Sequence, residues 1–248
     1  MSNTLIIQSH RHPLPYTWLE TCLNSVKYWA ELNYFDYQYI GDELFNYVST
    51  DLIKKTQSQP VIATDLARLK LLQSKLIEKY QNVIWCDADF LIFSPHQFIL
   101  PEDPYSLGRE VWIQHDKKNP NKLIAKVKVH NAFMMFRNNN TFLDFYADTA
   151  ERLLTLNTGN VPAQFIGPKL LTAIHNIAQC NVLETAGMLS PAVIKDIARG
   201  GGEALTLFKD NSKQKIAAAN LCSSLFARNE VSQLEMTQCI QHIPECIV

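Results

Sequence analysis

Asp87 and Asp89, which are separated by Ala88, are the side chains of this sequence best suited to hold a cation. They follow the apolar run at residues 83–86, which predicts a strand that is buried on both faces. Residues two apart in an extended segment point to the same side, so both carboxylates can reach one divalent ion. An ion that also binds a diphosphate offsets the cost of burying two acids. We therefore interpret the pair as a metal-dependent catalytic centre; the alternative is two turn residues that cap the next element.

A second charged pair, Asp65 and Arg68, lies about one helix before the aspartates. Residues 64–80 have the apolar spacing of a helix, and Thr64 is the predicted N-cap. Three-residue spacing puts Asp65 and Arg68 on one face of the first turn, where unpaired backbone N–H groups favour an anion. The pair is therefore predicted to help bind an anionic ligand. The alternative is a weak ion pair on the protein surface.

The elements that must position these residues alternate between strand and helix patterns. Strands are predicted at residues 4–8, 35–40, 83–86, 90–93, 111–114, 131–136 and 216–219. Helices are predicted at residues 64–80, 141–154, 168–178, 191–198 and 229–240, and along the apolar stripe Trp18, Cys22, Val26 and Trp29. A flexible link is expected at residues 200–202. With no repeat or linker, the chain is predicted to be one α/β domain, residues 1–248, around a mostly parallel sheet.

Composition narrows the classes of function. The chain has 248 residues, 47% of them hydrophobic, and a formal net charge of −1, so we expect no nucleic-acid partner and no attraction to an anionic membrane. Its first residues lack a basic leader, and no apolar run is long enough for a transmembrane segment. Six cysteines without a C-x-x-C pair predict buried, reduced thiols. These features favour a cytoplasmic protein.

Four segments, in this order, resemble the DxD sugar-binding glycosyltransferases of family 32. They are residues 63–72, 87–89, 130–136 and 166–171. The large glucosylating cytotoxins share this order of elements, and family 8 shares it more loosely. The resemblance implies a GT-A fold, which is a Rossmann-like mixed sheet flanked by helices. It also implies a hexosyltransferase that moves a sugar from a nucleotide-diphosphate sugar, with a UDP-sugar favoured, and retains the anomeric configuration.

The resemblance also implies roles for individual residues. Asp89 resembles the direct ligand of Mn²⁺ or Mg²⁺, and Asp87 resembles the residue that contacts the donor ribose and the metal region. Asp65 and Arg68 resemble the residues that hold the sugar hydroxyls and steady the diphosphate. Asn131 falls in the segment near the transferred sugar, and we count it with Asp87 and Asp89 as catalytic.

The remaining implied contacts to the donor come from two loops. Gly167 and Pro168 match a T-G-P turn in which Ile166 replaces the threonine. His10 and Arg11, followed by His12, come after the first strand, where GT-A enzymes place the base and ribose. The alternative for these loop residues is simple surface exposure.

Two further departures from family 32 concern the metal site and its strand. Residues 80–82 are Tyr-Gln-Asn where the family has Gly-Gly. Asn220 stands where the family often has a late histidine ligand, so the metal site is expected to be Asp87, Asp89 and Asn220.

Three other classes of protein compete with this interpretation. A degenerate transferase would bind a nucleotide sugar or a partner without turnover. A nucleotidyltransferase would carry a glycine-rich first loop, which is absent here. A phosphatase would place Asp-x-Asp after its first strand. The acceptor, whether glycan, lipid-linked or protein, is not defined by the sequence.

Overall fold

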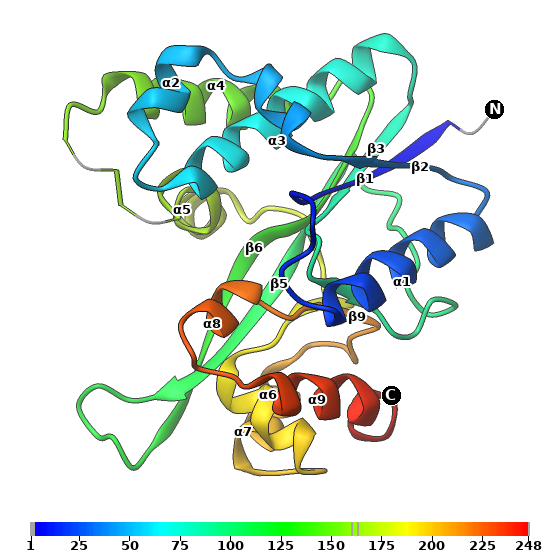
Figure 1. The fold of residues 1–248 in the computed structure, drawn as a ribbon, viewed down its shortest axis with the longest axis vertical. Coiled ribbons are helices and arrows are strands. Elements are labelled where there is room, and N and C mark those ends of the chain that lie inside the picture. The colour runs from blue at the N-terminus through cyan, green and yellow to red at the C-terminus, as the bar shows by residue number, and fades with distance from the viewer. Residues whose placement is uncertain (1–2, 160, 163, 248) are drawn as a thin grey trace.

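The computed structural model describes residues 3–159, 161–162 and 164–247 (Figure 1). Its strands are β1 (Thr4–Ser9), β2 (Asp36–Ile40), β3 (Asn82–Cys86), β4 (Phe90–Ile92), β5 (Tyr105–His115), β6 (Leu123–Arg137), β7 (Val182–Leu183), β8 (Ala186–Met188) and β9 (Ala218–Asn220). Its α-helices are α1 (Trp18–Leu32), α2 (Thr50–Lys55), α3 (Pro60–Glu78), α4 (Thr141–Leu156), α5 (Leu170–Ala178), α6 (Pro191–Ala198), α7 (Glu203–Asn211), α8 (Ser223–Ala227) and α9 (Gln233–Cys246). A 3₁₀ turn, η1 (Asp42–Tyr47), and an irregular turn, η2 (Phe165–Lys169), complete the described elements.

The main sheet is mixed rather than mostly parallel. In the described part of the chain its strand order is β2-β1-β3-β6-β5-β7. Strands β2, β1 and β3 are parallel, whereas β6 runs antiparallel to both β3 and β5. A second, small sheet has the order β4-β9-β8, so the strand predicted at residues 90–93 belongs to it instead. The predicted α/β class, with a mixed sheet flanked by helices, is confirmed.

Helices cover both faces of the main sheet because its central strands are apolar on both sides. Val83 and Trp85 of β3 pack in the cluster that includes α3 and α4, whereas Ile84 and Cys86 pack with α1. A third cluster joins α6, α7 and α9 to the outer part of β5 (Figure 1). The long β5–β6 ribbon therefore extends from the centre of the main sheet to the C-terminal helices.

Most predicted elements are confirmed; the errors include shifted boundaries and the unpredicted helices α2, α7 and α8. Helix α3 begins at Pro60 rather than at Thr64, because proline suits the first helical turn. Thr64 is inside the helix, and its hydroxyl donates to the carbonyl of Pro60. The last helix begins after Ser232, which forms a capping box with Glu235.

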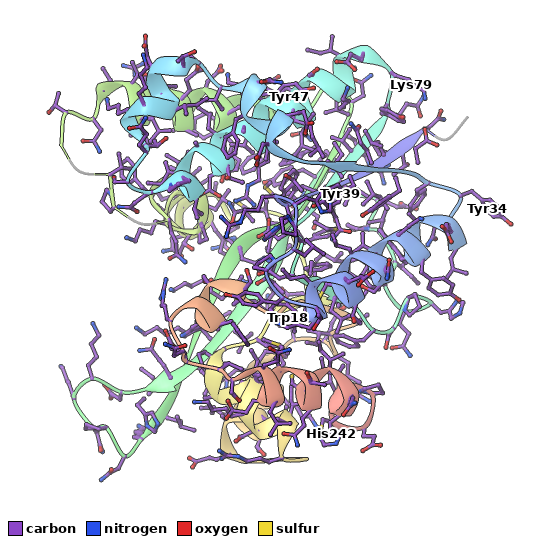
Figure 2. The ribbon with its side chains drawn as sticks, in the orientation of Figure 1. Trp18, Tyr34, Tyr39, Tyr47, Lys79 and His242 are labelled. Carbon is purple, nitrogen blue, oxygen red and sulfur yellow. The ribbon has the colours of Figure 1, made fainter. Side chains whose placement is uncertain are left out.

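Side chains predicted as core lie in the interior. Trp18 is 4% exposed, and all six cysteines are buried and free. By contrast, Tyr34 lies at the outer edge of the molecule, just after α1 (Figure 2). No helix of the described residues is long and apolar enough to cross a membrane.

Candidate functional site

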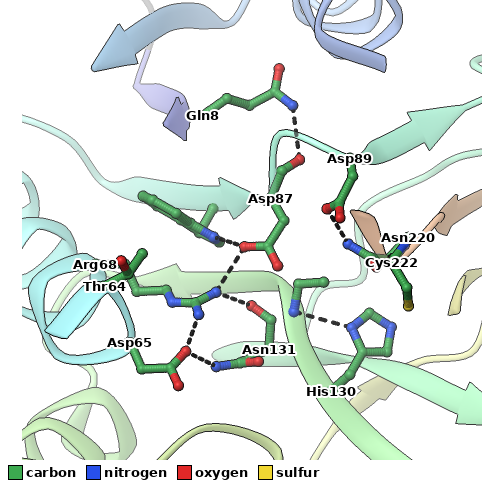
Figure 3. Close-up of polar contacts among 12 residues, drawn as sticks. Gln8, Thr64, Asp65, Arg68, Asp87, Asp89, His130, Asn131, Asn220 and Cys222 are labelled. Carbon is green, nitrogen blue, oxygen red and sulfur yellow. Dashed lines mark hydrogen bonds and ion pairs between the residues drawn. The ribbon is translucent and has the colours of Figure 1, made fainter. Parts of the chain in front are cut away.

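Arg68 is the centre of a buried polar network (Figure 3). Its Nη1 donates to Asp87 Oδ1 at 2.8 Å and to the carbonyl of Asn131 at 3.0 Å, and its Nη2 contacts Asp65 Oδ1. Asp65 is 2% exposed and Arg68 is 3% exposed, so the alternative of a surface ion pair is wrong. The predicted location in the first turn is also wrong, because α3 begins at Pro60. Asp65 and Arg68 therefore form a buried ion pair inside α3, away from the unpaired N–H groups of the helix terminus.

Asp87 ends β3 and joins this network to the main sheet. Its Oδ1 also accepts from Trp85 Nε1 at 2.7 Å, while Gln8 Nε2 donates to its backbone carbonyl at 3.1 Å. Among the described residues, Oδ2 accepts no hydrogen bond, and the side chain is 30% exposed. Burial raises the pKa of Asp87 to about 6; Arg68 opposes this rise and negatively charged Asp89 adds to it. One carboxylate oxygen is therefore left for a cation or another ligand.

Asp89 lies across the turn and is held by the C-terminal part of the chain. Its Oδ1 accepts from Asn220 Nδ2 and its Oδ2 accepts from the backbone N–H of Ser223, both at 2.6 Å. Pairing of β4 with β9 brings this about, since Phe90 and Asn220 are opposite each other. The structure thus places Asn220 beside Asp89, but with the amide nitrogen toward the carboxylate. The amide oxygen accepts from the N–H of Cys222 at 2.8 Å.

Asn131 and Gly167 enclose Asp65 from two other segments. Asn131 Nδ2 donates to Asp65 Oδ1 at 3.0 Å. A Cβ atom at Gly167 would lie 2.7 Å from Asp65 Oδ2 and 2.9 Å from Asn131 Nδ2, so only glycine allows this close approach. The hydroxyl of Tyr146 donates to the carbonyl of Ile166 at 2.8 Å and fixes the turn. Because Ile166 contributes its backbone to that bond, the loss of a threonine side chain does not remove the contact.

His130, which precedes Asn131, has a structural role. Its Nδ1 accepts from the N–H of Ala132 at 3.1 Å, so the proton is on Nε2, which contacts the carbonyl of Ala186 at 3.3 Å. Burial lowers the pKa of His130 to about 4. The ring fits against Gly108, where a Cβ atom would lie 2.1 Å away. His130 is therefore a neutral, buried side chain of β6 that packs against β5 and contacts β8.

A cavity of about 430 Å³ opens beside these side chains. This volume is within the range of small-ligand sites. The predicted residues that line it are Asp65, Arg68, Asp87, Asp89, Asn131, Pro168 and Asn220. They come from five separate segments of the chain. Of the predicted site residues, Gly167 lies just behind the wall, and His10 and Arg11 do not line this cavity.

The first loop contacts β2 instead. Tyr39 donates its hydroxyl to the carbonyl of His10 at 2.6 Å, and the His10 ring contacts the carbonyl of Arg11 (Figure 2 labels Tyr39). Arg11 is exposed. Gln8, two residues before His10, contacts Asp87, so the loop begins next to the site without entering the cavity.

Several cavity residues were missed by the sequence analysis. Glu110, Trp112 and Gln114 line it from β5, and Ser223 lines it from α8. The alternation of Trp112 and Gln114 in the strand predicted at residues 111–114 is a usable signal, because such residues share one face, and the longer observed strand adds Glu110 to it. Nothing in the sequence indicated Ser223, whose contribution is a backbone N–H.

The donor atoms at Asp87 and Asp89 are compatible with Mg²⁺ or Mn²⁺. Carboxylate and amide oxygens suit these hard ions better than Zn²⁺. Each ionised carboxylate has about four acceptor positions, so the N–H contacts to Asp89 leave room for a cation. In the described residues, however, no third His, Cys, Asp or Glu side chain joins the two aspartates in a metal-binding group. Such a site would need ligand atoms from the substrate.

The fold of the chain is similar to that of a known glycosyltransferase, whereas its sequence matches no described family. No protein-family model and no curated protein sequence matches the chain. The chain is similar to the crystal structure of a glycosyltransferase involved in the glycosylation of the major capsid of PBCV-1. The two chains are 11% identical, with a TM-score of 0.48, and the match covers 94% of this chain and 100% of the other.

Proposed function

We propose that this chain is a glycosyltransferase that moves a hexose from a nucleotide-diphosphate sugar to an acceptor hydroxyl. The observation that supports it is the Arg68 network on the cavity wall. One buried cation holds Asp65, Asp87 and the backbone of Asn131 within a single hydrogen-bonded unit. Fixed carboxylates and amides at a cavity are the groups that orient sugar hydroxyls. UDP-sugars are the favoured donors because the sequence resembles family 32, and that resemblance implies them.

The network suggests how a donor would be oriented. Asp65 and Asn131 are the groups proposed to bind the sugar hydroxyls, and Gly167 and Pro168 form the adjoining wall. The Nε–H of Arg68 is buried and has no partner among the described residues, and an unsatisfied buried donor is costly. An anionic donor group reaching that N–H would remove the cost. His10 and Arg11 are proposed to contact the nucleoside from beside the cavity.

We further propose that Mn²⁺ or Mg²⁺ binds at Asp87 and Asp89 together with the donor, with Asn220 at its edge. When bound, the ion neutralises charge on the departing diphosphate. The free oxygen of Asp87 is the most accessible protein ligand, since Asp89 is already held by Asn220 and Ser223. Retention of configuration is proposed from the family 32 resemblance.

A second candidate function is nucleotide-sugar binding without turnover. The observation that favours it is that both carboxylate oxygens of Asp89 accept short N–H bonds from the protein itself. Those donors supply compensation that a metal ion would otherwise provide. In this reading, the donor binds through Arg68 and Asp65, and no sugar is transferred.

A thermal-shift panel of UDP-, GDP- and CMP-sugars, each with and without Mn²⁺ or Mg²⁺, tests the proposal. A ligand at one hundred times its Kd should stabilise the folded state by about 2.7 kcal/mol. We expect stabilisation by a UDP-sugar only with the divalent ion. Asp89→Asn should abolish the metal-dependent binding of the donor while the protein stays folded. The substitution preserves the shape of the side chain and deletes its charge. If no nucleotide sugar raises the melting temperature, the donor site is wrong.

Donor hydrolysis separates the two candidate functions. A transferase should release free sugar slowly from the bound donor, with water as acceptor. Stabilisation by the donor without any release, over days of incubation, would support the binding protein.

A further inference from the structure

One face of β5 forms part of the cavity wall that the proposed donor contacts do not use. Glu110, Trp112 and Gln114 alternate along the strand and all three line the cavity, whereas Val111 and Ile113 between them are buried in the core. Side chains at alternate positions share one face of a strand. The β5 face is thus a separate row of groups beside the Arg68 network.

Glu110 is a buried carboxylate that forms a long ion pair with a partly exposed lysine. It is 7% exposed, and Lys128 Nζ, opposite it on β6, lies 3.7 Å from Glu110 Oε1. That distance exceeds a hydrogen bond. Burial raises the pKa of Glu110, and Lys128 opposes the rise. A buried acid that is incompletely paired is suited to accept a hydrogen bond from a ligand hydroxyl.

Trp112 differs from the other tryptophans of the chain. Trp18, Trp29 and Trp85 are 4%, 1% and 1% exposed and belong to the core. Trp112 is only half-buried and turns toward the cavity. An indole ring that is accessible on one side offers a flat apolar surface with a polar edge. Beside Glu110 and the amide of Gln114, it matches the apolar face and the hydroxyl rim of a sugar ring.

From this arrangement we infer that the β5 face, with Glu110, Trp112 and Gln114, is an acceptor subsite that binds a carbohydrate. The inference rests on the proposed transferase function and names the class of its acceptor. The proposed donor contacts come from α3, the β3–β4 turn, β6, η2, β9 and the loop after β1, so the β5 row remains available when the donor is bound. Helix α8, which lies along the β5–β6 ribbon (Figure 1), contributes Leu225 to the same cavity.

Acrylamide quenching of tryptophan fluorescence tests this subsite directly, because Trp112 is the tryptophan accessible to quencher. The probes are methyl glycosides of glucose, galactose, mannose and N-acetylglucosamine, added with UDP and Mn²⁺ present. A pocket ligand covers the groups it contacts, so at least one glycoside should reduce the quenching constant by about twofold. UDP with Mn²⁺ alone should leave the quenching unchanged. Quenching protection by UDP alone, or by no glycoside up to solubility, would overturn the inference.

Variants separate this subsite from the donor site. Glu110→Gln preserves shape and should abolish the protection by glycosides, while stabilisation by UDP with Mn²⁺ stays as in the wild type. Trp112→Phe should remove the quenchable emission. Tyr34→Phe, at the outer edge of the molecule (Figure 2), is the matched control and should change neither measurement. Loss of UDP binding in Glu110→Gln would show that Glu110 belongs to the donor site and would contradict the subsite.

Discussion

Arg68 Nη1 lies 2.8 Å from Asp87 Oδ1, which joins the middle of α3 to the end of β3. Through the same guanidinium, Asp65 and the backbone of Asn131 are held in one plane of contacts. The ring of Trp85 lies under the guanidinium, with Arg68 Cζ 5.4 Å from its centroid, and such a contact stabilises a buried cation. One side chain therefore links stability to the geometry of the site.

Replacing Arg68 by methionine should strongly destabilise the fold. The change leaves Asp65 and Asp87 buried without their cation, and breaking a buried pair costs about 3–5 kcal/mol. Urea unfolding at neutral pH measures the loss. Lys70→Met is the control, because Lys70 pairs with Glu151 at 2.7 Å with both side chains partly exposed, and such pairs contribute below about 1 kcal/mol. Equal losses in the free energy of unfolding in the two variants would show that the Arg68 network does not stabilise the fold more than a surface ion pair.

Gly167→Ala should weaken both donor binding and the fold. The new methyl group meets Asp65 Oδ2 and Asn131 Nδ2 and must displace them, and overpacking of this kind costs about 1–3 kcal/mol. We expect donor affinity, measured by calorimetry with a UDP-sugar and Mn²⁺, to fall about tenfold, equivalent to 1.4 kcal/mol. Gly159→Ala is the matched control, since its nearest neighbour would be 3.7 Å away. Unchanged affinity in Gly167→Ala would remove Asp65 from the donor site.

Asn220→His should tighten Mn²⁺ binding, and Asn220→Ala should weaken it. Histidine replaces a neutral amide by a nitrogen ligand that Mn²⁺ accepts, whereas alanine removes both the amide and its contact to Asp89. The measurement is Mn²⁺ affinity by calorimetry with UDP present, for the wild type and both variants. Three indistinguishable affinities would show that Asn220 only positions Asp89 and is not at the ion.

Metal-dependent donor binding should be lost as the pH falls through about 6. The pKa of Asp87 is raised to about 6 by burial, and a protonated carboxylate does not bind the ion, so affinity falls below that pH. Titrations of Mn²⁺ between pH 5 and 8, with UDP present, follow this loss. Asp87→Asn should show weak binding with little pH dependence. A flat profile in the wild type would mean that Asp87 is not a ligand.

His130 should make the folded state sensitive to acid. Its pKa is about 4 in the fold against 6.5 for an unperturbed histidine, so the unfolded chain binds the proton more readily. Stability is therefore unaffected above pH 6.5 and falls between 6.5 and 4, by about 3 kcal/mol in total. Urea unfolding at pH 7 and pH 4.5 measures the slope. His130→Gln should flatten it, whereas His115→Gln, at the exposed end of β5, should not.

The sequence predicted the Asp87 and Asp89 pair because their spacing and the preceding apolar strand are local features. It also put Asp65 and Arg68 on one helix face. Their burial was not predictable in the same way, since it depends on Asp87, which is 19 residues beyond Arg68. The start of α3 was misplaced because Thr64 was a plausible cap, although Pro60 is favoured in a first turn.

The parts that were missed depend on distant pairing. The ribbon of β5 and β6 is longer than predicted because polar residues continue each strand past its apolar core. Helix α7 is not predicted because it follows directly on Gly202, and three consecutive glycines indicate a flexible link. The orientation of Asn220 is set by Cys222 and Asp89 together, and a single sequence does not contain that geometry.

Three contacts tie Asp89 to the end of β9 and to the segment that follows it. Asn220 and Ser223 hold its carboxylate, and the N–H of Leu221 donates to its backbone carbonyl at 2.9 Å. During synthesis, β1, β3 and β6 leave the ribosome before this segment does, because they precede it in the chain. All residues of the Arg68 network are therefore made before the segment that holds the Asp89 carboxylate. The site is complete only after Asn220, Leu221 and Ser223 have folded back onto Asp89.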